Sequence, residues 1–341
     1  MDSDHNKSRT VVITGGSSGI GLQAAINLLK FGNRVILPCR DDKTKDNVKK
    51  LLKRSLNSND ISNVEFEIMD LSDLNQVSCF SKRIIGREKS IDTLILNAGL
   101  QYTGSPYPLF SAQGHELTFS VNHLSHFALT LSLLKLVLNS GEPRVVITSS
   151  EVHNPLSPGG RIGKGATLGR LVGMTNQNII MLDGSPTFNA DKSYKDSKLC
   201  NLLFAKKLSD YLEDIDSPIP ILCWAPGLVI PRSRAGFFRY SRQNNEFGQR
   251  VFAFVARDIL RITETPEGAG FLLYSLATST LYNKKGFSYY NNSVGLMHQK
   301  NKFSQSSVST EAEDKNLRDY LWKESLRIVR EYDLPIANFK L

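Results

Sequence analysis

Short apolar runs alternate with amphipathic stretches along most of the chain. The apolar runs predict strands at residues 11–14, 34–39, 64–69, 91–96, 144–149, 219–224 and 286–290. Between them, apolar positions recur at helical spacing, which predicts helices at residues 19–30, 42–56, 73–85, 113–138, 192–211, after 265 and at 312–331. Strands that are apolar throughout and separated by helices indicate a parallel sheet that is buried on both faces. We therefore predict an α/β fold, a Rossmann-type doubly wound parallel sheet of about seven strands with helices on both faces.

Two segments break this alternation. Residues 151–191 are punctuated by glycine and proline and are too long for an ordinary connection, so we interpret them as an insertion that shapes a site. Residues 228–261 are irregular, basic and aromatic, and are expected to cover a substrate. Neither an internal repeat nor a break in composition divides the chain, so we predict a single domain over residues 8–335.

Composition places the chain among globular enzymes. Of its 341 residues, 40% are hydrophobic and 22% are charged, which excludes disordered and fibrous classes. The most apolar stretch, residues 127–138, contains Lys135 and is much shorter than the ~20 residues of a membrane span, so it predicts a buried core helix. The first residues carry two aspartates and no apolar run, which argues against a signal or transit peptide and favours a cytoplasmic protein.

The net charge of +9 and the four cysteines narrow the chemistry only slightly. The cysteines are scattered without metal-ligand spacing, so we expect reduced thiols and no metal site. The charge suits an anionic cofactor, an acidic substrate or an anionic membrane surface, and equally a merely basic soluble protein. The sequence contains no arginine-rich tract of the kind that binds nucleic acid. Peripheral membrane association and a homo-oligomer are left open.

A glycine-rich turn connects the first predicted strand to the first predicted helix. There the backbone can approach a pyrophosphate while the helix N-terminus offers free N–H groups. The spacing G-x-x-x-G-x-G differs from the more usual G-x-G-x-x-G, and glycine-rich turns alone are weak evidence. Its position in the first βα turn nevertheless favours cofactor binding by Gly15, Ser17, Ser18, Gly19, Ile20 and Gly21.

The end of the second strand bears on cofactor choice. NAD enzymes usually place an acidic residue there, whereas an arginine suits the additional phosphate of NADP. Arg40 stands at this point and is followed by Asp41, so we predict NADPH. The alternative is that Arg40 is a solvated charge at a strand end.

Tyr194 and Lys198 lie four residues apart in a predicted helix, so their side chains share one face. A nearby ammonium favours the phenolate and lowers a tyrosine pKa, which would make Tyr194 useful for proton transfer. By itself this spacing is more often an ordinary helix face. Polar signals elsewhere, nearly all at the carboxyl ends of strands where such sheets bind ligands, raise its significance: Asp70, Leu71, Asn97, Ala98, Gly99, Asn122, Ser150, Pro226 and Gly227.

In order along the chain, these motifs resemble those of the short-chain dehydrogenase/reductase family over residues 10–290. The resemblance implies that Tyr194 donates a proton, that Lys198 lowers its pKa and holds the nicotinamide ribose, and that Ser150 orients the substrate. It further implies that Asn122 supports a water relay. By the same resemblance Asp70 and Leu71 flank the adenine, and residues 97–99 line the cofactor.

Within that family, Tyr194 follows Ser150 by an unusually long 44 residues. Together with residues 121–127, 168–174, 181–184, 194–201 and 286–292, this insertion is similar to the light-dependent protochlorophyllide reductases. That resemblance implies hydride transfer from NADPH to a C=C bond of a photoexcited tetrapyrrole, in chlorophyll biosynthesis and photosynthesis. It also maps Cys200 to a pigment-binding cysteine, although a buried cysteine commonly serves only packing.

Departures from that branch keep other functions open. Asn97-Ala98-Gly99 and Ala225-Pro226-Gly227 differ from its usual residues, and residues 228–261 match poorly, so the chain could be a paralogue with another substrate. A light-independent carbonyl or alcohol reductase like the retinol dehydrogenases is the first alternative. A non-catalytic NADP(H)- or pigment-binding scaffold is the second. The basic-aromatic residues 232–243 suit a membrane surface, a substrate carboxylate or a lid with solvated arginines.

Overall fold

One eight-stranded sheet organises the residues that the computed structural model describes, which are 8–230, 237, 239–244, 246–254, 256, 263–293 and 301–336. Its strand order is β3-β2-β1-β4-β5-β6-β7-β8; the first seven strands are parallel and β8 is antiparallel to β7. The strands are β1 (Thr10–Ile13), β2 (Arg34–Cys39), β3 (Val64–Ile68), β4 (Thr93–Leu96), β5 (Arg144–Thr148), β6 (Pro220–Ala225), β7 (Gly286–Ser293) and β8 (Lys302–Gln305).

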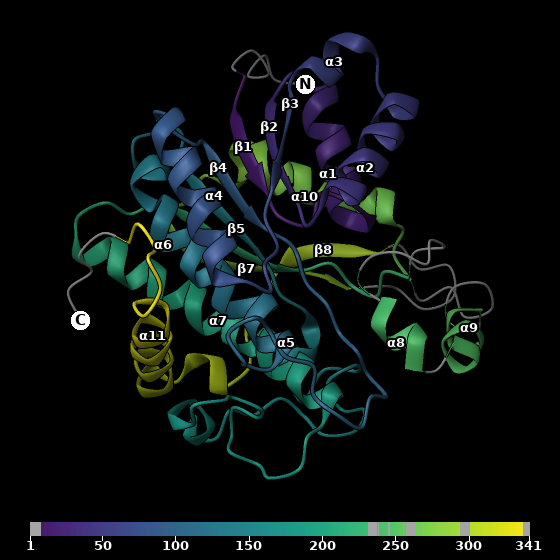
Figure 1. Cartoon of the computed structure of the whole chain (residues 1–341), viewed down its shortest axis with the longest axis vertical. Helices are drawn as coiled ribbons and strands as arrows, with labels where there is room; N and C mark the ends of the chain where they lie inside the picture. Colours follow the sequence, from purple (N-terminus) through teal and green to yellow (C-terminus); the bar gives the residue numbers. More distant parts are fainter. Residues whose placement is uncertain are drawn as a thin grey trace.

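Helices cover both faces of this sheet (Figure 1). On one face α1 (Gly19–Lys30), α2 (Asp42–Ser55) and α10 (Pro266–Thr278) share one hydrophobic cluster. On the other, a larger cluster joins α4 (Leu74–Arg87), α6 (Ser125–Leu138), α7 (Ala190–Asp214) and α11 (Lys315–Val329). Shorter helical elements are α3 (Ser58–Ser62), α5 (Leu117–Phe119), η1 (Ser120–Leu124), η2 (Glu151–His153), η3 (Val172–Thr175), α8 (Arg239–Asn244), α9 (Glu246–Phe254), η5 (Thr280–Tyr282) and η6 (Glu311–Glu313). The predicted doubly wound α/β fold is confirmed.

The structure differs from the predicted elements at the sheet edge, at one helix start and in the segment expected to be irregular, where α8 (Arg239–Asn244) and α9 (Glu246–Phe254) are helical. Strand β8 was not predicted, because its short polar sequence has no apolar run and it is fixed by pairing with β7. The helix expected from residue 113 begins instead at Leu117, where Glu116 caps it by accepting the backbone N–H groups of Thr118 and Phe119, each at 2.8 Å. The short helix α3 was also not predicted.

The continuous helical segment Leu117–Leu138 combines α5, the π-helical turn η1 and α6. By length and composition alone it could cross a membrane, with a mean hydropathy of 1.3 over its most apolar window. However, 89% of that window is buried within the fold, as expected for residues 127–138. The segment is therefore the central helix of the larger cluster.

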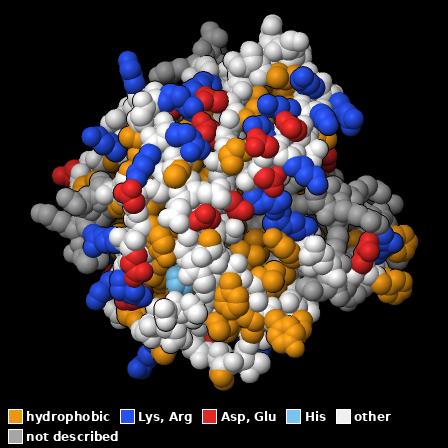
Figure 2. Space-filling model, in the orientation of Figure 1, with side chains coloured by type: hydrophobic (Ala, Val, Ile, Leu, Met, Phe, Trp, Pro, Cys, Tyr) orange, Lys and Arg blue, Asp and Glu red, His pale blue; other side chains and the backbone are white. Residues whose placement is uncertain are grey.

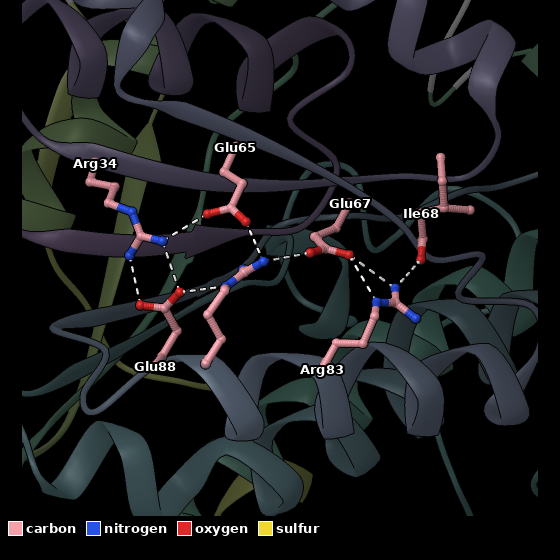
Figure 3. A network of polar contacts seen from close by, with 7 residues as sticks. Arg34, Glu65, Glu67, Ile68, Arg83 and Glu88 are labelled. Atoms are coloured by element: carbon pink, nitrogen blue, oxygen red, sulfur yellow. Dashed lines mark hydrogen bonds and ion pairs between the residues drawn. The ribbon is translucent and has the colours of Figure 1, made fainter.

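A ladder of ion pairs joins the edge strand β3 to α4 (Figure 3). Arg34 of β2 donates to both carboxylate oxygens of Glu88, at 2.7 and 2.8 Å, and to Glu65 at 2.7 Å. Arg87 continues the ladder to Glu67 at 2.9 Å, and Arg83 closes it at 3.0 Å from the same carboxylate. All five residues of β3 are only half-buried, so charged contacts supplement its modest apolar packing.

The site-bearing edge of the sheet follows from the strand order. Order reverses between β1 and β4, which are neighbours although β2 and β3 intervene in the sequence. Open α/β sheets bind ligands outside the carboxyl ends of the strands at such a switch point.

Hydrophobic side chains are concentrated on one part of the molecular surface near the insertion. Figure 2 shows them where the insertion and the segment before α5 run in Figure 1. Exposed members of these two segments are Tyr107, Leu109, Phe110, Leu156, Ile162, Val172 and Ile180.

Candidate active site

The glycine-rich turn after β1 packs so closely against neighbouring residues that Gly15 and Gly21 leave no space for a side chain. Gly15 has φ +69°, and a Cβ there would lie 2.7 Å from the Cα of Ala98. A Cβ on Gly21 would lie 2.3 Å from the carbonyl oxygen of Gly15. These contacts hold the turn against the β4 loop and pull α1 onto it, the close approach that a pyrophosphate-binding turn requires.

The N-terminus of α1 is open to an anion. Its N-cap, Ser18, makes no side-chain hydrogen bond to the first helical N–H groups. Ser17, Ser18, Gly19 and Ile20 are all half-buried at the surface. Unsatisfied N–H groups and the helix dipole both favour a negative group at this position. The structure thus fits the cofactor phosphates that the sequence assigns to this turn.

Arg40 and Asp41 have separate roles at the end of β2. Asp41 caps α2 by accepting the backbone N–H of Thr44 at 2.6 Å, and these hydrogen bonds to Thr44, with a smaller effect of Arg40, lower its pKa to about 2. The Arg40 side chain is 41% exposed and lies 3.1 Å from the same carboxylate. Asp41 therefore caps its helix and also pairs with Arg40, and both side chains are accessible at this strand end, at 41% exposure for Arg40 and 44% for Asp41.

Thr14 joins the ends of β1 and β4. Its hydroxyl oxygen accepts the backbone N–H groups of Asn97 at 2.9 Å and Ala98 at 3.0 Å. Asn97 also accepts the Thr148 hydroxyl of β5 at 3.3 Å. These hydrogen bonds connect the ends of three adjacent strands, β1, β4 and β5. We call the connected residues Thr14, Asn97 and Ala98 the cofactor floor, and Gly99 next to them lies beside Lys198.

The outer strand ends are also fixed. At the end of β3, the Asp70 carboxylate accepts the Ser72 backbone N–H and hydroxyl, each at 2.8 Å, and the Leu71 carbonyl accepts the Ser125 hydroxyl at 2.6 Å. At the end of β6, the Pro226 carbonyl accepts the Asn292 amide at 3.1 Å, and Gly227 has φ +79°. Apart from Tyr194 and Lys198, which lie on α7, the predicted cofactor residues therefore lie in turns at the same edge of the sheet or at the start of α1.

Tyr194, Lys198 and Ser150 meet beside this floor. Tyr194 and Lys198 lie one turn apart on α7, with the Lys198 Nζ 5.7 Å from the centroid of the tyrosine ring. The Ser150 hydroxyl, just after β5, hydrogen-bonds the Tyr194 phenol. Lys198 is 2% exposed and donates to the Thr148 carbonyl at 3.1 Å. The structure thus brings the three predicted catalytic side chains together.

Burial sets the protonation of this pair. Burial raises the pKa of Tyr194 above its ordinary value, although the Ser150 hydrogen bond acts in the opposite direction. Burial lowers the pKa of Lys198 to about 8. Lys198 is not among the groups that shift this pKa, so the expectation that it lowers the pKa of Tyr194 stays a prediction. At neutral pH Tyr194 holds its proton and Lys198 is mostly charged.

Asn122 braces the site from the π-helical turn η1. Its amide nitrogen donates to the Leu100 carbonyl and to the Ser197 hydroxyl, both at 3.0 Å, and its side-chain oxygen accepts the Leu100 N–H at 2.9 Å. Ser197 in turn donates to the Tyr194 carbonyl at 2.7 Å. The Asn122 carboxamide is therefore fully engaged in holding the β4 loop and α7, and the water relay implied by the resemblance remains a prediction.

The insertion is anchored to α7 by charges on either side of Tyr194. Lys192 pairs with Asp183 at 3.0 Å and with Asp196, and donates to the Thr167 carbonyl at 2.6 Å. Lys195 donates to carbonyls of residues 162 and 164. From the C-terminal part, Glu311 accepts the Leu168 N–H at 2.7 Å. Sequence reasoning missed these anchors, since charges at helical spacing usually indicate a solvated face.

Cys200 is a core residue of α7, two residues beyond Lys198. It is 0% exposed, belongs to the larger hydrophobic cluster, and burial raises the pKa of its thiol. This position supports the packing role of the cysteine over contact with a pigment. Cys39 and Cys223 are likewise buried, and within the described ranges no group of three His, Cys, Asp or Glu residues could hold a metal ion.

Part of the expected substrate-covering region contacts the site. Phe237 meets the Tyr194 ring edge-on with 5.3 Å between centroids, and the Ser241 hydroxyl donates to the Gln101 carbonyl at 3.3 Å. Both residues come from the 228–261 segment. Residues 231–236, 238, 245, 255 and 257–262 lie outside the described residues, and with them Arg232 and Arg234 of the basic-aromatic stretch.

Comparison with known proteins decides the family. The family model for short chain dehydrogenases matches residues 9–160. The chain is also 32% identical over 237 residues to a protochlorophyllide reductase of Avena sativa, an alignment covering 67% of this chain and 73% of that protein. The chain belongs to the short-chain dehydrogenase/reductase family. The predicted membership of this oxidoreductase family is therefore confirmed.

Other relatives carry different names. Human retinol dehydrogenase 14 is 31% identical over 65% of this chain and 62% of its own length. Protochlorophyllide reductase B of rice is 28% identical over 94% of this chain and 77% of its own length. The alignments cover only 50% of protochlorophyllide reductase A of Hordeum vulgare and of Triticum aestivum, and 62% of human retinol dehydrogenase 14. The activities of these whole proteins therefore do not transfer directly to this chain.

Solved structures agree on the fold. A protein of uncharacterised function from Mycobacterium paratuberculosis superposes with a TM-score of 0.63 at 25% identity, covering 94% of this chain and 93% of its own. RhlG of Pseudomonas aeruginosa, solved with NADP, superposes with a TM-score of 0.61 at 21% identity, covering 85% and 97%. Both superpositions therefore cover at least 85% of this chain.

Proposed function

We propose that this family member is an NADPH-dependent reductase. NADPH supplies the hydride. The open N-terminus of α1 and the Gly15–Gly21 turn receive the pyrophosphate, and Arg40 receives the ribose phosphate. The floor formed by Thr14, Asn97 and Ala98 supports the nicotinamide side.

Tyr194 acts as the proton donor. Its pKa is raised by burial, so the phenol carries a proton at neutral pH. It can release this proton to the atom next to the carbon that receives the hydride, because that neighbouring atom is left with the negative charge. Ser150 is hydrogen-bonded to the same phenol and orients the group to be reduced. The Lys198 ammonium is close enough to stabilise the phenolate that remains after transfer.

We further propose that the reduced group is a C=C bond of a tetrapyrrole, as in protochlorophyllide reduction, which is the light-dependent reaction of chlorophyll biosynthesis. One observation carries this substrate: the alignment with the protochlorophyllide reductase of rice runs over 94% of the chain, and so through the insertion between Ser150 and Tyr194. A location on or near a photosynthetic membrane belongs to the same proposal.

The test is a photoreduction assay. Purified protein, NADPH and protochlorophyllide are illuminated, and a red shift of the pigment absorbance that requires light, NADPH and protein is expected. A dark sample and Tyr194→Phe are the controls, and Tyr194→Phe should bind NADPH but lose most turnover. Bound pigment that shows no light-dependent change rules out the tetrapyrrole substrate.

A second reaction has its own observation. The 31% identity to human retinol dehydrogenase 14 favours a light-independent carbonyl or alcohol oxidoreductase on the same site. Dark oxidation of NADPH with retinal, aldehydes and ketones tests it. Turnover there, abolished by Tyr194→Phe, supports this reaction. Binding without turnover in either assay favours the non-catalytic scaffold.

A further inference from the structure

A buried histidine connects the cofactor turn to the helix that carries Asn122. His126 in α6 is 2% exposed. Its Nε2 lies 2.9 Å from the Thr14 hydroxyl, and its Nδ1 lies 3.1 Å from the Asn122 carbonyl oxygen. No side chain of the sequence-based site makes this connection, and His126 was not among the residues singled out there.

The hydrogen bonds around Thr14 fix the roles of the two ring nitrogens. The Thr14 hydroxyl oxygen accepts two backbone N–H groups, from Asn97 and Ala98, which occupy both of its lone pairs. Its single proton must then be donated, and the nearest acceptor is His126 Nε2; the Ile95 carbonyl lies at 3.3 Å. Nδ1 therefore carries the ring proton and donates it to the Asn122 carbonyl.

This arrangement keeps the imidazole neutral. Desolvation lowers the pKa of His126 to about 4, and the charge of Lys198 acts in the same direction. A protonated ring would carry a proton on Nε2 facing a hydroxyl whose lone pairs are already filled. His126 thus has one protonation state and one tautomer in which every partner is satisfied.

We propose that His126 is a positioning residue that keeps the cofactor floor and the catalytic helix α7 in a fixed position relative to each other. This inference rests on the proposed NADPH-dependent function. Through Thr14 it fixes the turn after β1 and the backbone of Asn97 and Ala98. Through the Asn122 carbonyl it fixes the turn whose side chain braces Leu100 and Ser197, and Ser197 holds the Tyr194 carbonyl. A shift at the cofactor is thereby transmitted to the proton donor.

The same helix provides a matched control. His123 is 1% exposed and lies three residues earlier, but its Nε2 contacts the Ser325 hydroxyl of α11 at 3.1 Å. Its ring packs against Phe119 and Phe204, away from the cofactor turn. Replacing His123 therefore removes an equally buried imidazole without touching the proposed connection.

The experiment compares NADPH dissociation constants, measured from NADPH fluorescence, well below the melting temperature of each variant. We expect His126→Leu to raise the constant by about 5- to 30-fold, the effect of losing a buried hydrogen bond and leaving its partner unsatisfied. His123→Leu should lower stability but leave the constant within about twofold of wild type. His126→Gln, which can still accept from Thr14, should recover most of the affinity, whereas His126→Asn, which is too short to reach Thr14, should not.

Turnover separates the two contacts further. Because His126→Gln places its amide at the Nε2 end of the ring, it loses the donor to the Asn122 carbonyl, so kcat should remain low while NADPH affinity is restored. Wild-type affinity in His126→Leu, or an equal loss of affinity in His123→Leu, overturns the positioning role. Failure of the wild-type protein to bind NADPH instead overturns the proposed function, and with it the role of His126.

Discussion

Replacing Lys192 with methionine tests whether the insertion is fastened to the catalytic helix by buried charge. Lys192 has a side chain that is 5% exposed and its partner Asp196 one that is 1% exposed. Burial raises the pKa of Asp196 to about 7, although Lys192 acts in the opposite direction. Desolvation therefore destabilises the charged form of this carboxyl even with its partner present. Methionine keeps the volume of the lysine stem but leaves Asp196 without its cation.

The expected loss is large. Removing one partner of a buried ion pair costs about 3–5 kcal/mol where the remaining charge stays uncompensated. Because the pKa of Asp196 is already about 7, the carboxyl can take up a proton near neutral pH, so the full loss is expected only well above pH 7. Lys192 also donates to Thr167 and pairs with Asp183, so part of the loss appears as local detachment of the insertion. Since whole proteins are stable by only about 5–15 kcal/mol, the effect should be easily measured.

Two measurements report it. Urea denaturation gives the free energy of unfolding, and limited trypsin digestion reports opening of the insertion, which carries the exposed cleavage sites Arg161, Lys164 and Arg170. We expect faster cleavage at these sites and a lower kcat, because Tyr194 lies two residues from the anchor.

The chain offers a control and a rescue. Arg250 and Glu246 form a pair at the same i,i+4 spacing, but their side chains are 62% and 49% exposed, so Arg250→Met should cost no more than about 0.5 kcal/mol. Adding Asp196→Asn to Lys192→Met removes the unpaired charge while keeping an acceptor for Thr167, and should recover part of the stability. A loss below about 1 kcal/mol with unchanged trypsin sensitivity would refute the anchoring argument.

Three further outcomes follow from the site. Because burial lowers the pKa of Lys198 to about 8, the ammonium is lost as pH rises through that value, and kcat for reduction should fall about tenfold per pH unit above it; a profile flat to pH 10 contradicts this role. Arg40→Glu should weaken NADPH binding by about 10- to 100-fold while leaving NADH binding within a few-fold, as measured by fluorescence titration, since a hydrogen bond to a charged group contributes about 1.5–3 kcal/mol. Gly21→Ala should reduce NADPH affinity by displacing the phosphate turn, whereas Gly86→Ala, where an added Cβ meets nothing within 4 Å, should raise unfolding free energy by about 0.5–1 kcal/mol without affecting binding; equal behaviour of the two variants would remove the steric explanation.

The sequence predicted the features that depend on local pattern. Most of the first seven strands are apolar runs, so all seven could be located. The turns that follow them contain Ser150 and most of the predicted cofactor residues, whereas Tyr194 and Lys198 were predicted from their spacing on a helix. Strand β8 could not be found in this way. Its residues Lys302 to Gln305 are mainly polar, and only the pairing with β7 makes them a strand.

Long-range burial accounts for the other misses. Lys192, Lys195 and Asp196 have the spacing of a solvated helix face, and nothing local shows that the insertion folds back to cover them. His126 appears in the sequence as one polar residue in an apolar helix, and its partner Thr14 is 112 residues away. The burial that raises the pKa of Tyr194 could not be predicted either, because residue spacing shows the proximity of a charge but not desolvation.

The ion-pair ladder between β3 and α4 also bears on self-association of the folded protein. Because β3 pairs only with β2, it ends the sheet and could serve as a template for a strand from another molecule. Glu65 and Glu67 place charges along that edge, and both are held by arginines rather than left to rotate away. Replacing the ladder with apolar residues would leave this strand with an uncharged edge, which favours aggregation through strand pairing between molecules.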